Sequence, residues 1–176
     1  MRTVTYGAAC SLDGFIAGPN GEIDWLRPSR ESTEIMRQYW SSIDTVLMGR
    51  KTWEPAAEYY RSGGPATGGV KTYVFSRTLT KIDVVGVELV RDDAPHFVRV
   101  LKTQRGKGIC LMGGGELARA LFEADLVDSV GMNVHPILLG AGIPLFRDPH
   151  RRVALELETC RALEGGCVYS LYRIVH

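Results

Sequence analysis

The sequence predicts an α/β fold with one mixed sheet, parallel in its core and antiparallel at its C-terminal strands, flanked by helices. Up to about Asp125, short apolar segments alternate with segments whose apolar residues recur at helical spacing, which is typical of parallel strands joined by helices. After Asp125, three strand-like segments follow without a convincing helix between them, which indicates antiparallel pairing. A chain of 176 residues, 45% of them hydrophobic, fits one domain over residues 1–176.

In the N-terminal half, strands and helices are expected to alternate. Residues 3–10 alternate in polarity and predict a strand, which a loop to about residue 27 follows. Pro28 and Ser29 then open a helix whose apolar residues recur at helical spacing. The further elements of this half are a buried strand over 44–48, a helix over 51–60, strands over 72–75 and 84–90, and a helix over 95–104.

The C-terminal half begins with a strand over residues 109–112, three glycines and a helix. The apolar residues of that helix recur at the spacing of a stripe that packs on a sheet. Strands over 127–134, 153–158 and 167–175 follow, and residues 164–166 are typical of the turn of a closing hairpin.

Composition excludes several classes of function. The formal net charge of +1, from 21 basic and 20 acidic residues, argues against nucleic acid as a partner. No apolar run approaches about 18 residues, so no membrane span is expected, and no signal-peptide pattern precedes the first strand. The four cysteines, Cys10, Cys110, Cys160 and Cys167, lack C-x-x-C spacing. We therefore expect free thiols in a cytoplasmic protein, and no metal site.

Three consecutive glycines stand where a strand passes into a helix. Gly113, Gly114 and Gly115, with Ala118, satisfy the G-x-G-x-x-G/A pattern, in which a backbone without Cβ atoms approaches a diphosphate. A Rossmann domain should carry a carboxylate about 20 residues further on, and none is in place. The glycines therefore bind a dinucleotide outside an ordinary Rossmann domain, or serve only a tight turn.

Two further strand ends carry residues suited to phosphate. The segment "VLMGRKTWE" places Gly49, Arg50, Lys51 and Thr52 after a buried strand, and "VFSRT" places Ser76 and Arg77 after another. Ligands of open α/β sheets bind beyond the carboxyl ends of the strands, so the three junctions together suit one ligand with several phosphates. The alternative for each basic residue alone is a solvated surface charge.

These three segments resemble the NADPH-binding segments of the dihydrofolate reductase fold, in the same order. "AACSLDGFIAGPNGEIDWL" and "HPILLGAGIPLF" resemble one branch of it, the C-terminal reductase domain of the bifunctional riboflavin-biosynthesis deaminase–reductase and its stand-alone bacterial relatives. The resemblance spans nearly the whole chain and implies a dihydrofolate reductase-like fold. The zinc deaminase signature of the bifunctional enzyme, H-x-E followed by P-C-x-x-C, is missing.

The resemblance implies that NADPH is the cofactor. Arg50 and Thr52 would hold its phosphates, with Lys51 nearby, and Ser76 with Arg77 would meet the adenosine 2′-phosphate. The full set of implied cofactor contacts is Ala9, Ile16, Gly49, Arg50, Lys51, Thr52, Ser76, Arg77, Gly113, Gly114, Gly115 and Glu116.

The resemblance implies fewer contacts for the substrate than for the cofactor. Trp25 would lie near the substrate end of the cleft, and Arg27 or Arg30 would pair with a ribose phosphate. Arg30 occupies the place where dihydrofolate reductases carry a carboxylate, and Glu31 stands beside it.

Two further polar residues are considered for the reacting centre. Asp13 is the candidate catalytic group, and its alternative is a loop carboxylate that bonds turn N–H groups ahead of Gly14. His135, before Pro136, is expected to be structural.

The resemblance thus implies an NADPH-dependent reductase that transfers a hydride to a pyrimidine or pterin. It is most like 5-amino-6-(5-phosphoribosylamino)uracil reductase of riboflavin biosynthesis. The alternatives are a dihydrofolate reductase with a displaced carboxylate, such as Glu31, and a non-catalytic protein that binds NADPH or a pterin. The expected partner is a small heterocyclic substrate, and the resemblance implies a homodimer.

Overall fold

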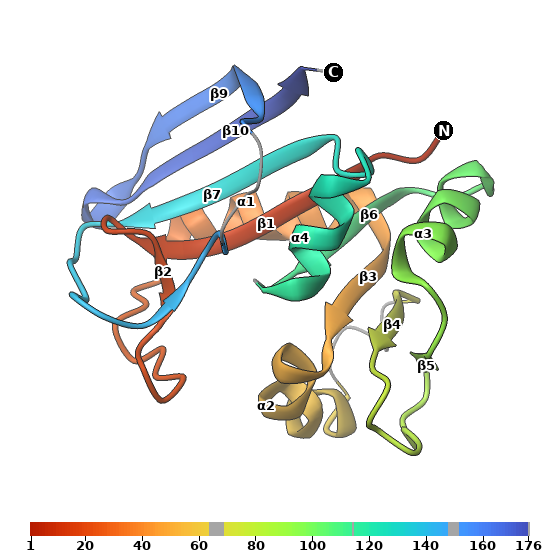
Figure 1. Cartoon of the computed structure of the whole chain (residues 1–176). Helices are drawn as coiled ribbons and strands as arrows, with labels where there is room; N and C mark the ends of the chain where they lie inside the picture. The colour runs from red at the N-terminus through yellow and green to blue at the C-terminus, as the bar shows by residue number, and fades with distance from the viewer. Residues whose placement is uncertain (64–68, 114, 148–151, 176) are drawn as a thin grey trace.

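Eight strands form one sheet in the order β5-β4-β3-β6-β1-β7-β10-β9, as the computed structural model shows (Figure 1). The structure describes residues 1–63, 69–113, 115–147 and 152–175. The strands of this sheet are β1 (Val4–Ser11), β3 (Ile43–Gly49), β4 (Lys71–Phe75), β5 (Val87–Val90), β6 (Gly108–Met112), β7 (Ser129–His135), β9 (Ala154–Ala162) and β10 (Val168–Val175). The strands from β5 to β7 in this order pair in parallel, whereas β10 is antiparallel to both β7 and β9. The predicted mixed sheet is confirmed.

Within the described residues, four helices flank the sheet in two layers. They are α1 (Arg30–Ser42), α2 (Arg50–Arg61), α3 (Ala94–Thr103) and α4 (Glu116–Glu123). Trp53 of α2 and Tyr39 of α1 pack in one apolar cluster, whereas Val98 of α3 and Leu121 of α4 pack in the other. In Figure 1, α4 lies in front of the sheet and α1 behind it. Among the helices of the described residues, none is long and apolar enough to cross a membrane.

The start of α1 agrees with the prediction, and its capping explains why. Ser29 is the N-cap residue: its hydroxyl accepts the backbone N–H of Ser32 at 3.1 Å, and the Ser32 hydroxyl accepts the backbone N–H of Ser29 at 2.8 Å. Such a reciprocal capping box satisfies two of the N–H groups that a helix start leaves unpaired.

Two short strands differ from the prediction, as do the start of β5 and the end of β9, which runs to Ala162 rather than to residue 158. β2 (Phe15–Ala17) and β8 (Ile143–Pro144) form a separate two-stranded sheet, and each is too short to show alternation in the sequence. A Cβ atom on Gly142 would lie 2.2 Å from the Ala17 carbonyl oxygen, so this pairing requires a glycine. β5 begins at Val87 rather than at residue 84, because the Val87 N–H bonds the Val84 carbonyl in a turn.

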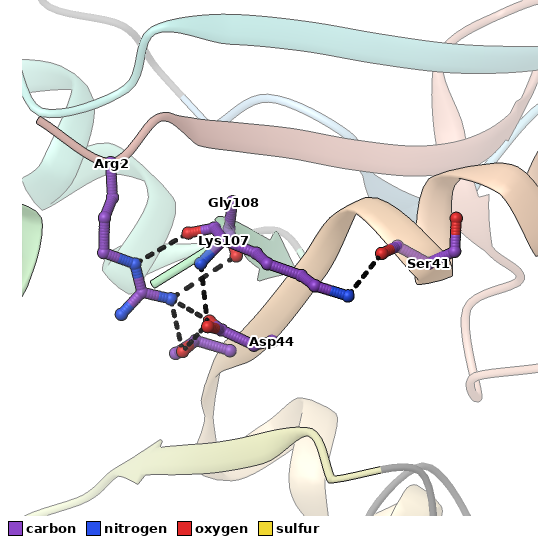
Figure 2. A network of polar contacts seen from close by, with 6 residues as sticks. Arg2, Ser41, Asp44, Lys107 and Gly108 are labelled. Carbon is purple, nitrogen blue, oxygen red and sulfur yellow. Dashed lines mark hydrogen bonds and ion pairs between the residues drawn. The ribbon is translucent and has the colours of Figure 1, made fainter. Parts of the chain in front are cut away.

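At the amino ends of the parallel strands, which we call the amino edge, ion pairs with buried cations tie the chain together. The Arg2 guanidinium, whose side chain is 6% exposed, pairs with Asp44 and donates to Thr45 Oγ1 at 2.7 Å and to the Lys107 carbonyl at 2.7 Å. Figure 2 shows how Arg2, Asp44 and Lys107 converge from three segments. Lys107 in turn donates its backbone N–H to Asp44 Oδ2 at 2.8 Å.

A second ion pair lies at the same edge. Lys102 Nζ is 2.6 Å from Asp128 Oδ2, which also accepts the Val4 backbone N–H at 2.6 Å. Lys102 further donates to the Leu126 carbonyl at 3.1 Å. The start of β1, the end of α3 and the start of β7 are thereby joined.

Candidate functional site

The predicted junctions meet at the opposite edge, where β4, β3, β6, β1 and β7 end side by side. We call it the carboxyl edge. In the β3–β4 pairing Gly49 lies opposite Phe75, and in the β3–β6 pairing Met48 lies opposite Met112. The segments 49–52, 76–77 and 113–115 therefore follow three neighbouring strands. This agrees with the expectation that ligands of open α/β sheets bind beyond the carboxyl ends of the strands.

Two of the junctions touch. A Cβ atom on Gly113 would lie 2.1 Å from Thr52 Oγ1, and Gly113 has a φ of +83°, so both the contact and the backbone conformation require glycine. A Cβ atom on Gly49 would in turn lie 4.0 Å from Leu117 Cβ on α4. The starts of α2 and α4 are thus held against each other.

The third described glycine of these turns has open space around it. Gly115 has a φ of +91°, and a Cβ atom there would have no atom within 4 Å from the described residues beyond its chain neighbours. Gly114 lies outside the described residues. The turn before α4 therefore approaches Thr52 on one side and leaves backbone accessible on the other.

The helices that start at this edge differ in their capping. Ser29 caps α1, and Asp93 Oδ1 caps α3 by accepting the His96 N–H at 2.8 Å. By contrast, α2 begins after Gly49 and α4 after Gly115, and no side chain of the described residues caps either of them. Uncapped helix starts offer N–H groups and a partial positive charge to an anion. The two uncapped starts are the two whose turns touch.

The basic residues of the site are not equivalent. Arg50 Nη1 lies 2.7 Å from Glu54 Oε1, one turn along α2. Lys51 and Arg77 are exposed, and the described residues provide neither with an ion-pair partner. Ser76 Oγ accepts the backbone N–H groups of Thr78 at 3.1 Å and Leu79 at 3.0 Å, so it shapes the turn that presents Arg77.

Three other predicted cofactor contacts occupy different surroundings. Ala9 lies on β1 opposite Asn133 of β7, two residues before the strand ends at Ser11. Ile16 lies on β2, partly buried against the core. Glu116 is exposed in the first turn of α4, so its backbone N–H, rather than its carboxylate, suits an anion.

The predicted substrate residues lie around the start of α1. Trp25 is buried, and its ring packs edge-on against the His135 ring, with centroids 5.5 Å apart. Arg27 and Arg30 are exposed. Glu31 Oε2 accepts the Glu164 backbone N–H at 2.7 Å, so the hairpin between β9 and β10 holds that carboxylate.

Asp13 holds a distant loop. Its Oδ1 accepts the Leu139 N–H at 3.1 Å and its Oδ2 accepts the Gly140 N–H at 2.8 Å. Hydrogen bonds from the Ser11 side chain, and then from these backbone groups, lower the pKa of the Asp13 carboxyl below its ordinary value. Asp13 is therefore a loop carboxylate that bonds turn N–H groups, as the alternative predicts, but the turn that it holds lies more than 120 residues further along the chain.

The sequence analysis treats His135 as structural and does not identify Asn133 and Cys167 as its partners. This ring is buried, with Nδ1 3.3 Å from Cys167 Sγ and Nε2 3.4 Å from Asn133 Nδ2. Burial lowers the pKa of His135, which keeps the ring neutral at neutral pH. The alternation "NVH" at the end of β7 was the available signal, because it places Asn133 and His135 on one face.

A cavity of about 700 Å³ lies beside α4 in the part of the chain that the structure describes. Ala118, Phe122, Leu145 and Val153 are among its lining residues, and Gly115 borders it. Thr52 and Arg77 do not line it. The site assembled from the strand ends is therefore an open edge rather than this cavity.

Comparison with known protein families and sequences gives a consistent result. The family described as the RibD C-terminal domain matches residues 2–169. The uncharacterized protein YyaP of Bacillus subtilis (strain 168) is 35% identical over 183 residues, covering 98% of this chain and 95% of YyaP. YwjB of the same organism, also uncharacterized, is 32% identical over 164 residues, covering 89% of each.

Solved structures share the fold. A putative riboflavin biosynthesis protein from Shewanella sp. PV-4 superposes with a TM-score of 0.84 at 22% identity, covering 99% of this chain and 100% of the other. The deaminase/5-amino-6-(5-phosphoribosylamino)uracil reductase of Thermotoga maritima gives 0.72 at 16%, covering 99% of this chain and 57% of that protein. Dihydrofolate reductase from Enterococcus faecalis, complexed with NADP(H), gives 0.68 at 16%, covering 99% and 97%. The predicted dihydrofolate reductase-like fold is confirmed.

Proposed function

This chain belongs to the RibD C-terminal domain family, and we propose that it is an NADPH-dependent reductase that transfers a hydride to a pyrimidine- or pterin-type substrate. The observation that carries the proposal is the contact between Gly113 and Thr52, which joins the two uncapped helix starts at the carboxyl edge. Two adjacent sets of free N–H groups suit a diphosphate.

The cofactor supplies the hydride, and the residues of the chain bind and orient it. The backbone from Gly113 to Gly115 and the start of α2 hold the diphosphate, with Arg50, Lys51 and Thr52 beside it. Arg77 pairs with the 2′-phosphate, because an exposed guanidinium without an ion-pair partner among the described residues is available to one. Ala9 and Ile16 border the nicotinamide.

On the substrate side, we propose 5-amino-6-(5-phosphoribosylamino)uracil, the compound named for the similar Thermotoga maritima reductase. The exposed guanidinium of Arg27 or Arg30 pairs with its phosphate, and Trp25 borders the ring. The role of the chain is to hold the acceptor carbon against the nicotinamide and to exclude water. Asp13 acts through the loop that it holds, since an exposed carboxylate with a lowered pKa is ionised at neutral pH and is a poor proton donor.

Steady-state assays of NADPH consumption test this proposal. We expect consumption with 5-amino-6-(5-phosphoribosylamino)uracil and little with dihydrofolate, because the hairpin occupies Glu31, the carboxylate nearest the pterin-binding position. Faster consumption with dihydrofolate would favour the dihydrofolate reductase alternative. Tight NADPH binding without consumption of either acceptor would favour a binding protein.

We further propose a cytoplasmic homodimer. All four cysteines are free thiols, as is usual in a reducing compartment. β9 is an edge strand on which Leu155 and Leu157 are exposed, at 44% and 53%, and exposed apolar edge strands favour association. Light scattering on the purified protein tests the dimer, and Leu157→Glu should convert it to a monomer.

A further inference from the structure

Two buried polar atoms lack a hydrogen-bond partner within the described part of the chain: the Tyr39 hydroxyl oxygen and Asn133 Oδ1. Both lie between α1 and the sheet. Tyr39 comes from α1, and its hydroxyl would lie 4.0 Å from a Cβ atom on Gly7 of β1. Asn133 comes from β7, and because Val130 and Val134 face the α3–α4 side, it faces the α1 side. Buried polar atoms are nearly always paired, so a ligand or a water completes these two.

In the structure Asn133 directs the nitrogen end of its amide at His135, which leaves the oxygen end free. The amide nitrogen Nδ2 lies 3.4 Å from His135 Nε2, and an amide nitrogen only donates, so Nε2 accepts. The ring proton then sits on Nδ1, directed at Cys167 Sγ 3.3 Å away. Trp25 packs edge-on against the same ring. The His135 ring therefore holds the amide so that Oδ1, a hydrogen-bond acceptor, is the free end.

Asn133 also lies beside the proposed nicotinamide position. It is paired with Ala9, and the next side chain on this face, His135, is paired with Ser11 at the carboxyl end of β1. The residue is partly exposed although Oδ1 itself is buried. Tyr39 lies deeper, near Thr5 and Cys110, which do not reach hydrogen-bond geometry with its hydroxyl. Of the two unpaired atoms, Asn133 Oδ1 is the one next to the proposed reaction centre.

We propose that Asn133 determines substrate specificity: its Oδ1 accepts a hydrogen bond from a ring N–H of a neutral pyrimidinedione-type heterocycle bound between α1 and the ends of β1 and β7. His135 and Cys167 are positioning residues that orient the amide. This inference rests on the proposed function and adds to it the chemical group by which the substrate is recognised. A ring whose nitrogens are methylated lacks that donor and leaves Oδ1 unpaired.

The test compares two probes by calorimetry in the presence of saturating NADPH: 5,6-diaminouracil and its 1,3-dimethyl derivative. The wild type should bind the unmethylated probe about tenfold more tightly, the effect of about one hydrogen bond in a buried site. Asn133→Leu keeps the volume of the side chain but not the acceptor, and it should bind the two probes with affinities within about twofold of each other. A preference caused by the bulk of the methyl groups alone would persist in this variant and would overturn the inference.

Three matched variants sharpen the result. Tyr39→Phe removes the other unpaired atom and should leave the preference unchanged. His135→Gln, which still offers an acceptor to the amide, should keep the preference, whereas His135→Leu should lose it. Loss of the preference in Tyr39→Phe, or its survival in His135→Leu, would contradict the assigned roles.

The affinity for NADPH, measured alone on every variant, distinguishes a failure of the proposed function from a failure of the inference about Asn133. Unchanged affinity shows that the variant is folded. A wild type that binds no NADPH would refute the proposed function itself. A wild type that binds NADPH but takes both probes equally, or neither of them, would overturn the inference about Asn133 and leave the reductase proposal standing; Oδ1 would then be satisfied by water.

Discussion

The amino and carboxyl edges of the same parallel strands are built in opposite ways. At the amino edge, Arg2, Asp44, Lys102 and Asp128 all have charged or backbone partners. Figure 2 shows those of Arg2 and Asp44. At the carboxyl edge, α2 and α4 start without side-chain caps, and Lys51 has no ion-pair partner among the described residues. Polar groups that are paired within the chain stabilise the fold, whereas polar groups left unpaired at a strand-end edge are available to a ligand.

The capping of the helices shows which part of the carboxyl edge carries the unpaired N–H groups. All four helices start at the carboxyl edge, and two of them, α1 and α3, are capped by Ser29 and Asp93. The two that are not capped lie next to each other through Gly113 and Thr52. The uncapped helix starts are therefore confined to one place on that edge, and substitutions at the two edges should affect different properties.

The largest effect on stability is expected from Asp44→Ala at the amino edge. It leaves the buried Arg2 guanidinium without its carboxylate, which should lower the free energy of unfolding by about 3 kcal/mol. Denaturant unfolding measures this loss, and Asp83→Ala, in an exposed ion pair with Lys81, is the control with a cost below about 1 kcal/mol. NADPH affinity of the folded protein should not change; a parallel loss of affinity would break the comparison between the edges.

Gly113→Ala should affect both stability and binding. The new Cβ atom would collide with Thr52 Oγ1 in a left-handed backbone conformation, which should cost about 2 kcal/mol and displace the two helix starts. Gly115→Ala is the matched control, because it has a similar φ but no atom near the added methyl group. Thermal unfolding and NADPH titration measure the effects, and equal losses in the two variants would mean that the contact with Thr52 is unimportant.

Arg77→Ala should change binding without changing stability. Loss of the guanidinium should weaken NADPH binding about tenfold and leave NADH binding nearly unchanged, since NADH lacks the 2′-phosphate. Arg50→Ala should have a smaller effect, because Arg50 is already paired with Glu54. Arg37→Ala, in an exposed pair with Glu34 on α1, serves as the control. Equal weakening of NADPH and NADH by Arg77→Ala would remove the assignment to the 2′-phosphate.

The smallest effect is expected from Asp13→Asn and depends on pH. The folded-state pKa of Asp13 is lowered, so its contribution to stability is fully present above the ordinary carboxyl pKa of about 3.9 and is lost as the pH falls through the lowered value. The difference in stability between wild type and Asp13→Asn should therefore be constant near neutral pH and shrink in acid. Urea unfolding at pH 7 and pH 3 measures it, and a difference that grows in acid would show that the sign is wrong.

The main elements of the fold could be predicted because periodicity is a local property. The capped start at Ser29 and the strand before Gly49 are both readable from a few neighbouring residues. β2 and β8 could not be predicted, since three and two residues are too few to show a period. The turn that delays β5 depends on a single bond between Val87 and Val84.

For the site, the tendency of ligands to bind beyond the carboxyl ends of strands predicts where the three junctions lie, but not which residues they contact. That Gly113 approaches Thr52, that Glu31 meets Glu164 and that Asp13 holds Gly140 all depend on how distant segments pack. The uncapped starts of α2 and α4 were visible as glycines in the sequence, whereas the pairing of His135 with Cys167 had no local signal.

The pairing of β2 with β8 has a consequence for motion. The loop after β1 and the loop after β7 are joined by these strands, by the Leu12 N–H bonded to the Ile137 carbonyl at 2.9 Å, and by the Leu145 N–H bonded to the Gly14 carbonyl at 2.8 Å. Neither loop can swing outward alone without breaking several bonds at once. The two segments form one cooperative opening unit, so their amide hydrogens should exchange with solvent at a common rate.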